Sequence, residues 1–132
     1  MTNSATVQAM YDAFGRGDIP FILDQLTDDV SWEDGALDHG VPWLRPGVGK
    51  DHVMAFFGVL ADFEFRRFEI ESVSGAGDIV VGVLQVGALV RSTGRSFESL
   101  EVHVWRFDAA GKVRAFNHVL DTVQHVAAAQ AA

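Results

Sequence analysis

The chain has 132 residues, 48% of them hydrophobic, and no cysteine, which fits one globular domain over residues 1–132 and excludes disulfides, thiolate nucleophiles and cysteine metal sites. Because 18 acidic side chains outnumber 10 basic ones, giving a formal charge of −8 at pH 7, the chain would repel a phosphate backbone, and we do not expect it to bind nucleic acid. No apolar run approaches the roughly 18 residues of a membrane span, so we expect a cytoplasmic protein with no membrane partner.

The N-terminal part of the chain predicts two helices followed by a strand. Residues 4–16 begin at a serine or threonine N-cap and place apolar side chains at helical spacing, at Val7, Met10, Tyr11 and Phe14. Asp18 can cap a second short helix in IPFILDQL, where Pro20 is tolerated in the first turn. The next segment, DDVSWED, has strand character, and GKDHVMAFFGVLADF predicts a third, amphipathic helix.

From residue 63 onward the pattern changes to long strands. They are FEFRRFEIESVSG, DIVVGVLQVGALVRS, RSFESLEVHVWRFD and KVRAFNHVLDTV, separated by the turn signals GAGD, STGR and DAAGK. Helices followed by strands indicate the α+β class. We expect a strongly curved mixed or antiparallel sheet wrapped around three N-terminal helices, enclosing a cone-shaped cavity.

The connection SWEDGALDHGVPWLRPG, residues 31–47, gathers aromatic and charged side chains among glycines and prolines. Such a composition predicts a loop, which is either solvated or one wall of a binding site. We interpret residues 35–47 as a lid over the mouth of the cone, with Trp32 and Trp43 as walls.

Side-chain alternation divides the last two strands into faces. The odd positions of the first are Ser99, Glu101, His103, Trp105 and Phe107, and those of the second are Val113, Ala115, Asn117, Val119 and Asp121. If Phe107 pairs with Val113, His103 lies opposite Asn117, with Asp121 further along the same face. The odd face either lines the cavity or is half-solvated outside, and a small polar set among apolar groups favours the cavity.

The even positions of the same strands are more apolar, at Leu100, Val102, Val104, Phe116 and Leu120. A face this apolar is unsuited to water, so we expect it to pack against a second copy of the chain. The sequence therefore predicts a homodimer through the sheet.

The order of these elements resembles the nuclear-transport-factor-2-like superfamily, in particular its ketosteroid-isomerase-like and SnoaL-like polyketide cyclase branches. The similarity spans nearly the whole chain. YDAFGRGDIPFILDQLTDDVSWEDG resembles the helix, turn, helix and strand that open those proteins, and FFGVL, VHVWRFDAAGKV and LDT are similar to their third helix, final hairpin and last strand end.

The resemblance also implies roles for particular residues. Asp34 of WEDG matches the general base of the ketosteroid isomerases, and His103 stands where they carry the donor to the oxyanion. The tyrosine of their first helix falls on Met10, with Tyr11 one position further. In the SnoaL-like cyclases the matching acid and base is Asp121, with a histidine similar to His103 on the neighbouring strand.

We therefore expect a pocket for a small, apolar, carbonyl-bearing molecule and an enzyme that removes a proton alpha to the carbonyl. Asp34 or Asp121 is the expected base, with His103 as donor and six residues lining the substrate site, Tyr11, Trp32, Trp43, Glu101, Trp105 and Asn117. Isomerase, cyclase, dehydratase and hydrolase chemistry all stay open. The alternative is a non-catalytic ligand-binding or dimerisation module on the same fold.

The sequence predicts neither a cofactor nor a metal site. No phosphate-binding glycine loop or Gly-x-Ser-x-Gly motif is present. The five histidines show no ligand spacing, and His103 and His118 have opposite parity on their strands.

Overall fold

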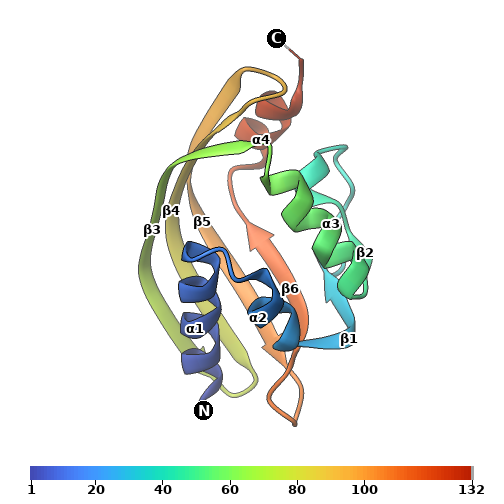
Figure 1. Cartoon of the computed structure of the whole chain (residues 1–132), viewed down its shortest axis with the longest axis vertical. Helices are drawn as coiled ribbons and strands as arrows, with labels where there is room; N and C mark the ends of the chain where they lie inside the picture. The colour runs from blue at the N-terminus through green and yellow to red at the C-terminus, as the bar shows by residue number, and fades with distance from the viewer. Residues whose placement is uncertain (132) are drawn as a thin grey trace.

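Six strands form one mixed sheet in the computed structural model, which describes residues 1–131 (Figure 1). In chain order the elements are α1 (Asn3–Gly15), α2 (Ile19–Asp24), β1 (Leu26–Trp32), a 3-10 turn η1 (Pro42–Leu44), β2 (Gly47–Val48), α3 (Lys50–Leu60), β3 (Phe63–Ala76), β4 (Ile79–Val90), β5 (Arg95–Phe107), β6 (Val113–Val119) and α4 (Thr122–Ala129). Every helix within residues 1–131 is too short or too polar to cross a membrane.

The second helix begins at its predicted cap, and the first begins one residue earlier than predicted. The Thr2 hydroxyl accepts a hydrogen bond from the Ala5 amide at 3.1 Å, and Asp18 Oδ1 accepts one from the Phe21 amide at 3.2 Å. Each cap satisfies an amide that has no partner within the helix. The apolar stripe of α1 is buried, with Met10 and Tyr11 facing the sheet side of the molecule.

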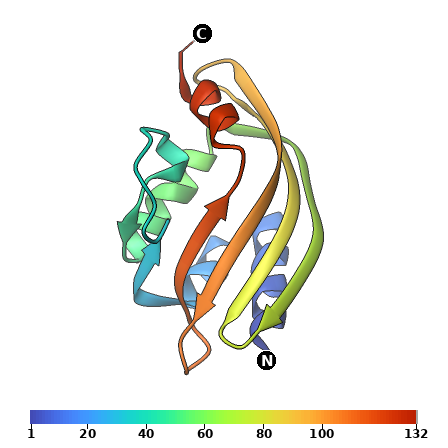
Figure 2. The same ribbon diagram turned by 180° about the vertical axis from the view of Figure 1, so that it is seen from behind.

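The strand order is β2-β1-β6-β5-β4-β3, and all neighbours are antiparallel except β1 and β6. The long strands β3, β4 and β5 curve around the helices, and Figure 2 shows the same sheet from behind. The expected α+β class is confirmed. The helices are not all N-terminal, however, because β1 and β2 separate α2 from α3 and the helix α4 follows the last strand.

The register of the final hairpin changes at a β-bulge. Phe107 pairs with Val113, as predicted, but Arg106 pairs with Ala115, so Arg114 is an extra residue on β6. One extra residue turns every later side chain of a strand to the other face. The prediction that His103 lies opposite Asn117 is therefore wrong, because His103 pairs with His118.

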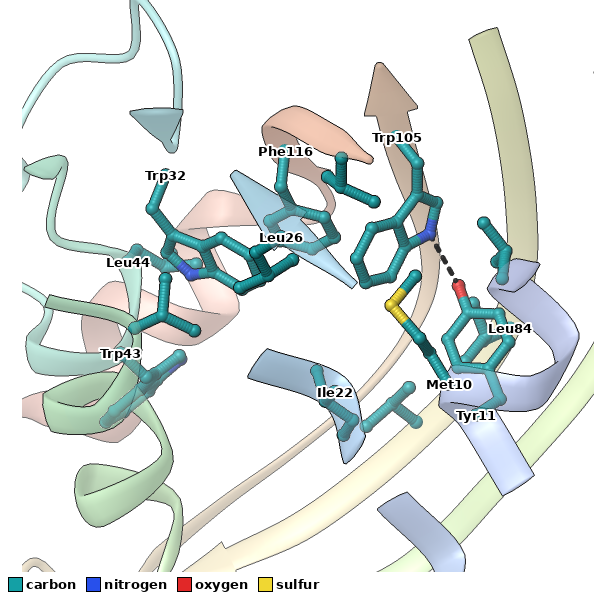
Figure 3. Packing of buried hydrophobic residues seen from close by; sticks show 14 of the residues in the cluster. Met10, Tyr11, Ile22, Leu26, Trp32, Trp43, Leu44, Leu84, Trp105 and Phe116 are labelled. Atoms are coloured by element: carbon teal, nitrogen blue, oxygen red, sulfur yellow. Dashed lines mark hydrogen bonds between the residues drawn. The ribbon is translucent and has the colours of Figure 1, made fainter. Parts of the chain in front are cut away.

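The same bulge moves Phe116 from the outer face into the core. Its ring is 2% exposed and stacks on Trp32, with centroids 4.2 Å apart (Figure 3). Leu120 is also partly buried against the core. The expectation that these two side chains lie on the outer face is therefore wrong.

Candidate functional site

A cavity lies between the concave face of the sheet and the helices, with about 80 Å³ open to the centre of a water molecule. Most of its walls are aromatic, and Trp32, Trp43 and Trp105 all contribute. Its polar lining comes from Tyr11, Glu101, His103, His118 and His125. An apolar chamber with a few converging polar groups is the usual form of a small-molecule site.

Strand β5 supplies most of the polar wall. Its odd positions from Phe97 to Phe107 are all buried, whereas its even positions are exposed or half-buried. The prediction that the odd face of this strand points inward is confirmed. Glu101, 4% exposed, is thereby placed inside the protein beside His103.

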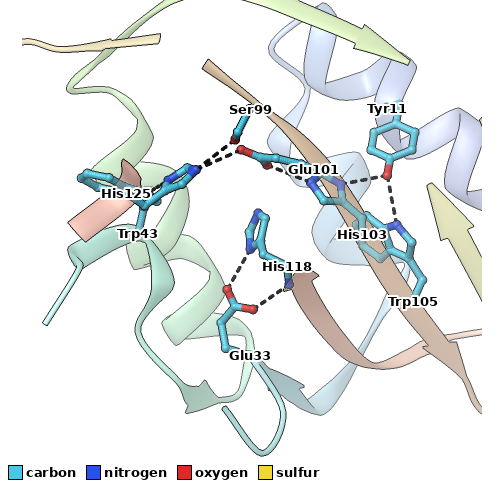
Figure 4. Close-up of polar contacts among 9 residues, drawn as sticks. All are labelled: Tyr11, Glu33, Trp43, Ser99, Glu101, His103, Trp105, His118 and His125. Atoms are coloured by element: carbon cyan, nitrogen blue, oxygen red, sulfur yellow. Dashed lines mark hydrogen bonds and ion pairs between the residues drawn. The ribbon is translucent and has the colours of Figure 1, made fainter. Parts of the chain in front are cut away.

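Tyr11, His103 and Glu101 form a hydrogen-bonded chain (Figure 4). The Tyr11 hydroxyl oxygen lies 2.8 Å from His103 Nδ1, and His103 Nε2 lies 3.4 Å from Glu101 Oε1. An ionised carboxylate can only accept, so a neutral His103 carries its proton on Nε2 and accepts the Tyr11 proton at Nδ1. The Trp105 indole N–H donates to the Tyr11 oxygen at 3.2 Å, which leaves that hydroxyl free to donate to the imidazole.

The second oxygen of Glu101 faces His125 of α4. The Trp43 indole N–H donates to His125 Nδ1 at 2.8 Å. Because an indole nitrogen is only a donor, the His125 proton lies on Nε2, which is 3.5 Å from Glu101 Oε2 and 3.4 Å from the Ser99 hydroxyl. Glu101 is therefore held by a histidine at each oxygen.

Glu33 and His118 form a second polar pair across β1 and β6. The two carboxylate oxygens of Glu33 accept from the His118 amide and from His118 Nδ1, each at 2.8 Å. Glu33 is 3% exposed and has a φ of 56°, in the left-handed region. That conformation costs a residue with a side chain about 1–2 kcal/mol. It turns Glu33 inward directly after the buried Trp32.

The surroundings shift the pKa values of the two neighbouring histidines in opposite directions. Burial opposes the charge on His118, but the charge of Glu33, its hydrogen bond and the charge of Glu101 outweigh that effect and raise the pKa of His118. Burial lowers the pKa of His103, and the hydrogen bond that His103 donates to Glu101 offsets this only in part. The pKa of His118 therefore lies above that of His103, and His118 is the one of the pair that favours the charged form.

The same surroundings also shift the pKa values of Glu101 and Tyr11. Burial alone would raise the pKa of Glu101, but hydrogen bonds from His103 and His125 and the charge of His118 hold it well below its ordinary value. Burial raises the pKa of the Tyr11 hydroxyl above its ordinary value. Glu101 is therefore ionised and Tyr11 protonated at neutral pH.

The structure brings only part of the predicted site together. Six of the predicted residues line the cavity, namely Tyr11, Trp32, Trp43, Glu101, His103 and Trp105. Asp34 is exposed, and its Oδ1 accepts from the Ser31 hydroxyl at 2.8 Å. Asp121 is exposed at the start of α4, where it accepts from the Gln124 side chain. The expected convergence of these two carboxylates with His103 is wrong.

Asn117 also lies away from the cavity. It follows the bulge, so its side chain points to the other face and donates to the Asp34 carbonyl at 2.9 Å. The 35–47 loop is part wall and part solvated surface, because Trp43 lines the cavity on η1 whereas residues 36–40 are exposed.

Glu33, His118 and His125 belong to the site but were not predicted from the sequence. A left-handed residue breaks strand alternation at Glu33, and the bulge reverses it at His118. A helical stripe on α4 could have indicated His125, since Ala128 three residues later is buried on the same side.

Comparison with known proteins identifies one matching family and several solved structures with a similar fold. The family described as "SnoaL-like domain" matches residues 7–116, and no curated protein matches the sequence. An NTF2-like protein of unknown function from Burkholderia pseudomallei is 29% identical, with a TM-score of 0.82 over 99% of this chain and 100% of its own. An NTF2-like protein from Burkholderia thailandensis is also 29% identical, with a TM-score of 0.83 over 98% of both chains.

A third solved structure is more distant in sequence. It is described as a candidate polyketide cyclase from Pseudomonas putida, and it is 20% identical, with a TM-score of 0.78 over 98% of this chain and 99% of its own. At that identity the likeness concerns the fold alone. The α+β fold with its open six-stranded sheet is thus the fold of NTF2-like proteins.

Proposed function

Since the chain belongs to the SnoaL-like domain family, we propose that its cavity binds a small, largely apolar, carbonyl-bearing molecule and catalyses cofactor-independent proton transfer alpha to the carbonyl. The observation that carries this proposal is the hydrogen-bonded chain of Tyr11, His103 and Glu101 beside His118 at the polar wall of an aromatic cavity, where the pKa of His103 is lowered and that of His118 is raised. A base and an electrophile with separated proton affinities are what enolisation requires.

In this proposal Tyr11, His103 and Glu101 act as a proton relay. The substrate C–H proton passes to the Tyr11 oxygen while the Tyr11 proton passes to His103 Nδ1, 2.8 Å away. Because burial raises the pKa of Tyr11, a free phenolate is unfavourable, and the two transfers occur in one step. The imidazolium that forms is stabilised by ionised Glu101.

His118 stabilises the negative charge that develops on the substrate oxygen. Its Nδ1 is held by Glu33, and its other ring nitrogen points towards Glu101 and His103 (Figure 4). A cationic N–H placed in an apolar cavity is an effective oxyanion donor, because little water screens it. Reversing the relay returns the proton to the same or a neighbouring carbon, which corresponds to exchange or isomerisation.

The test separates binding from chemistry. All three tryptophans line the cavity, so their fluorescence reports binding of aryl ketones such as 1-tetralone. Deuterium exchange into the bound ketone, followed by mass spectrometry, reports proton transfer. We expect His103→Gln to keep binding and to slow exchange by about 10²–10⁴-fold, with exposed Asp34→Asn as the matched control. Exchange that is unchanged in His103→Gln would overturn the proposal.

The alternative function is ligand binding without catalysis. The same cavity and aromatic walls support it, and the relay would then serve only to hold the ligand. Fluorescence quenching by a ketone with no enzyme-dependent exchange would favour this alternative.

Association through the sheet also stays a proposal. On its outer face Leu100 and Val119 are 51% and 56% exposed, and around them lie the half-buried side chains of Val81, Val83, Val102 and Val104. Covering this patch with a second copy would remove apolar surface from water. Light scattering should give a dimer mass for the wild type and a monomer mass for Leu100→Glu.

A further inference from the structure

The cavity contains three side chains with the geometry of metal ligands. One ligand atom from each of Glu101, His103 and His118 lies within 4.8 Å of the other two. The two histidines are directly opposite each other on β5 and β6, so the strands themselves hold them side by side. Two imidazoles and one carboxylate are a ligand set that zinc and neighbouring transition metals accept.

Each of these side chains also has a partner for its remaining polar atom. Glu33 holds His118 Nδ1 at 2.8 Å, and the Tyr11 hydroxyl lies 2.8 Å from His103 Nδ1. The third partner, His125 Nε2, is 3.5 Å from Glu101 Oε2. Ligating histidines in metal sites are oriented in this way, by a bond from the ring nitrogen that does not bind the metal.

Charge favours a cation at the same place. Glu101 lines the cavity and Glu33 binds His118 from behind that lining, and each carboxylate is at most 4% exposed. Among the described residues, no lysine or arginine lines that cavity. Two buried carboxylates need a positive charge close by, and a divalent ion supplies it in place of the proton that His118 gives up when its Nε2 becomes a ligand.

We propose that this cluster binds one divalent transition-metal ion, of the zinc or cobalt class, through Nε2 of His103, Nε2 of His118 and one oxygen of Glu101. Two bonds of about 2.1 Å through zinc span at most ~4.2 Å, so binding draws the outermost ligand atoms inward by on the order of 1 Å. Three protein ligands leave a position open towards the aromatic cavity. That position can take an oxygen of a bound molecule.

This inference does not depend on the proposed proton transfer. A metal on His103 Nε2 places the His103 proton on Nδ1, which then donates to Tyr11 and cannot accept the Tyr11 proton. The metal-bound form is therefore blocked in the relay, and metal binding is measured with no ketone present. Failure of one proposal leaves the other standing.

The experiment uses the full chain after treatment with a chelator. Titration with Co²⁺, followed by its visible absorption and by calorimetry, should show one ion per chain in low-symmetry coordination, displaced by Zn²⁺. His103→Ala and Glu101→Gln should each weaken binding at least 100-fold. Glu33→Gln, which removes an orienting partner and no ligand, should weaken it about 10–100-fold.

The exposed histidine His39 provides the matched control, and His39→Ala should leave the Co²⁺ affinity and spectrum unchanged. Near-ultraviolet circular dichroism checks that each variant is folded. Binding that persists in His103→Ala and Glu101→Gln, or no stoichiometric binding by the folded wild type, would overturn the proposal.

Discussion

His103 and His118 lie directly opposite each other on β5 and β6, with ring centroids 4.9 Å apart and planes nearly perpendicular. Their surroundings nevertheless give the two imidazoles different pKa values, because the Glu33 carboxylate bonds His118 and not His103. Burial lowers the pKa of His103. The polar wall thus places a group that favours the neutral form next to one that favours the charged form, and this difference is the basis of the proposed chemistry.

Glu33→Gln should destabilise the protein. The amide can keep a bond to the His118 main chain, but it no longer pairs with the imidazolium. Loss of a buried, charge-assisted hydrogen bond of this kind costs about 1–3 kcal/mol. Urea unfolding of the chelator-treated protein measures the loss, and Ser31→Ala serves as a control because it removes a bond of exposed Asp34 on the adjacent strand end. Equal stability of Glu33→Gln and wild type would contradict the pairing.

Stability should be greatest near pH 6.5 in the metal-free protein. His118 has a raised pKa, so its contribution is complete below the ordinary value of 6.5 and is lost as pH rises through the folded value. His103 and Glu101 have lowered pKa values, so their contributions are lost as pH falls below 6.5 and 4.5, respectively. The urea concentration at the midpoint of unfolding, measured from pH 4 to pH 9, should therefore fall on both sides of pH 6.5, which gives the profile an acid limb and an alkaline limb.

The alkaline limb of that profile belongs to the Glu33–His118 pair. It should flatten in Glu33→Gln, because the raised pKa of His118 depends largely on this carboxylate. An alkaline limb of the same steepness in the variant would assign it to another group.

Gly82→Ala should disturb the relay from outside the cavity. Gly82 pairs with His103 across β4 and β5, and a methyl group there would overlap the Tyr11 hydroxyl. Overpacking of this kind costs about 1–3 kcal/mol, and deuterium exchange should slow because Tyr11 moves from His103. In a Tyr11→Phe background, which lacks the hydroxyl, Gly82→Ala should cost less stability than it does in the wild type, because the closest overlap is gone. An equal cost of Gly82→Ala in the two backgrounds would contradict this packing.

Asp121→Asn should have little effect on exchange. Its side chain lies outside the cavity and bonds only Gln124 among the described residues. We expect a change of less than about twofold, because surface substitutions away from such sites are generally mild. A loss comparable to that of His103→Gln would return this carboxylate to the catalytic site.

The inner face of β5 could be predicted from the sequence because alternation continues unbroken from Phe97 to Phe107. That regularity placed Glu101, His103 and Trp105 in the cavity. The helix starts next to Thr2 and Asp18 could also be predicted from the sequence, because capping is a local property of the chain.

The opposite wall could not be predicted from the same rule. His118 faces inward only because Arg114 is an extra residue in β6, and no composition signal marks a bulge there. Glu33 faces inward because it takes a left-handed conformation that few residues with side chains adopt. The neighbouring Asp34, which fits the resemblance better, is left outside.

The most direct test of the account is the protonation of the two opposed histidines. Nitrogen-15 chemical shifts of the imidazoles, measured at pH 7 on chelator-treated protein and assigned with His103→Gln and His118→Gln, report each ring separately. We predict that His118 carries protons on both nitrogens, whereas His103 is neutral with its proton on Nε2. A neutral His118, or a doubly protonated His103, would contradict the division of roles from which the proposed function follows.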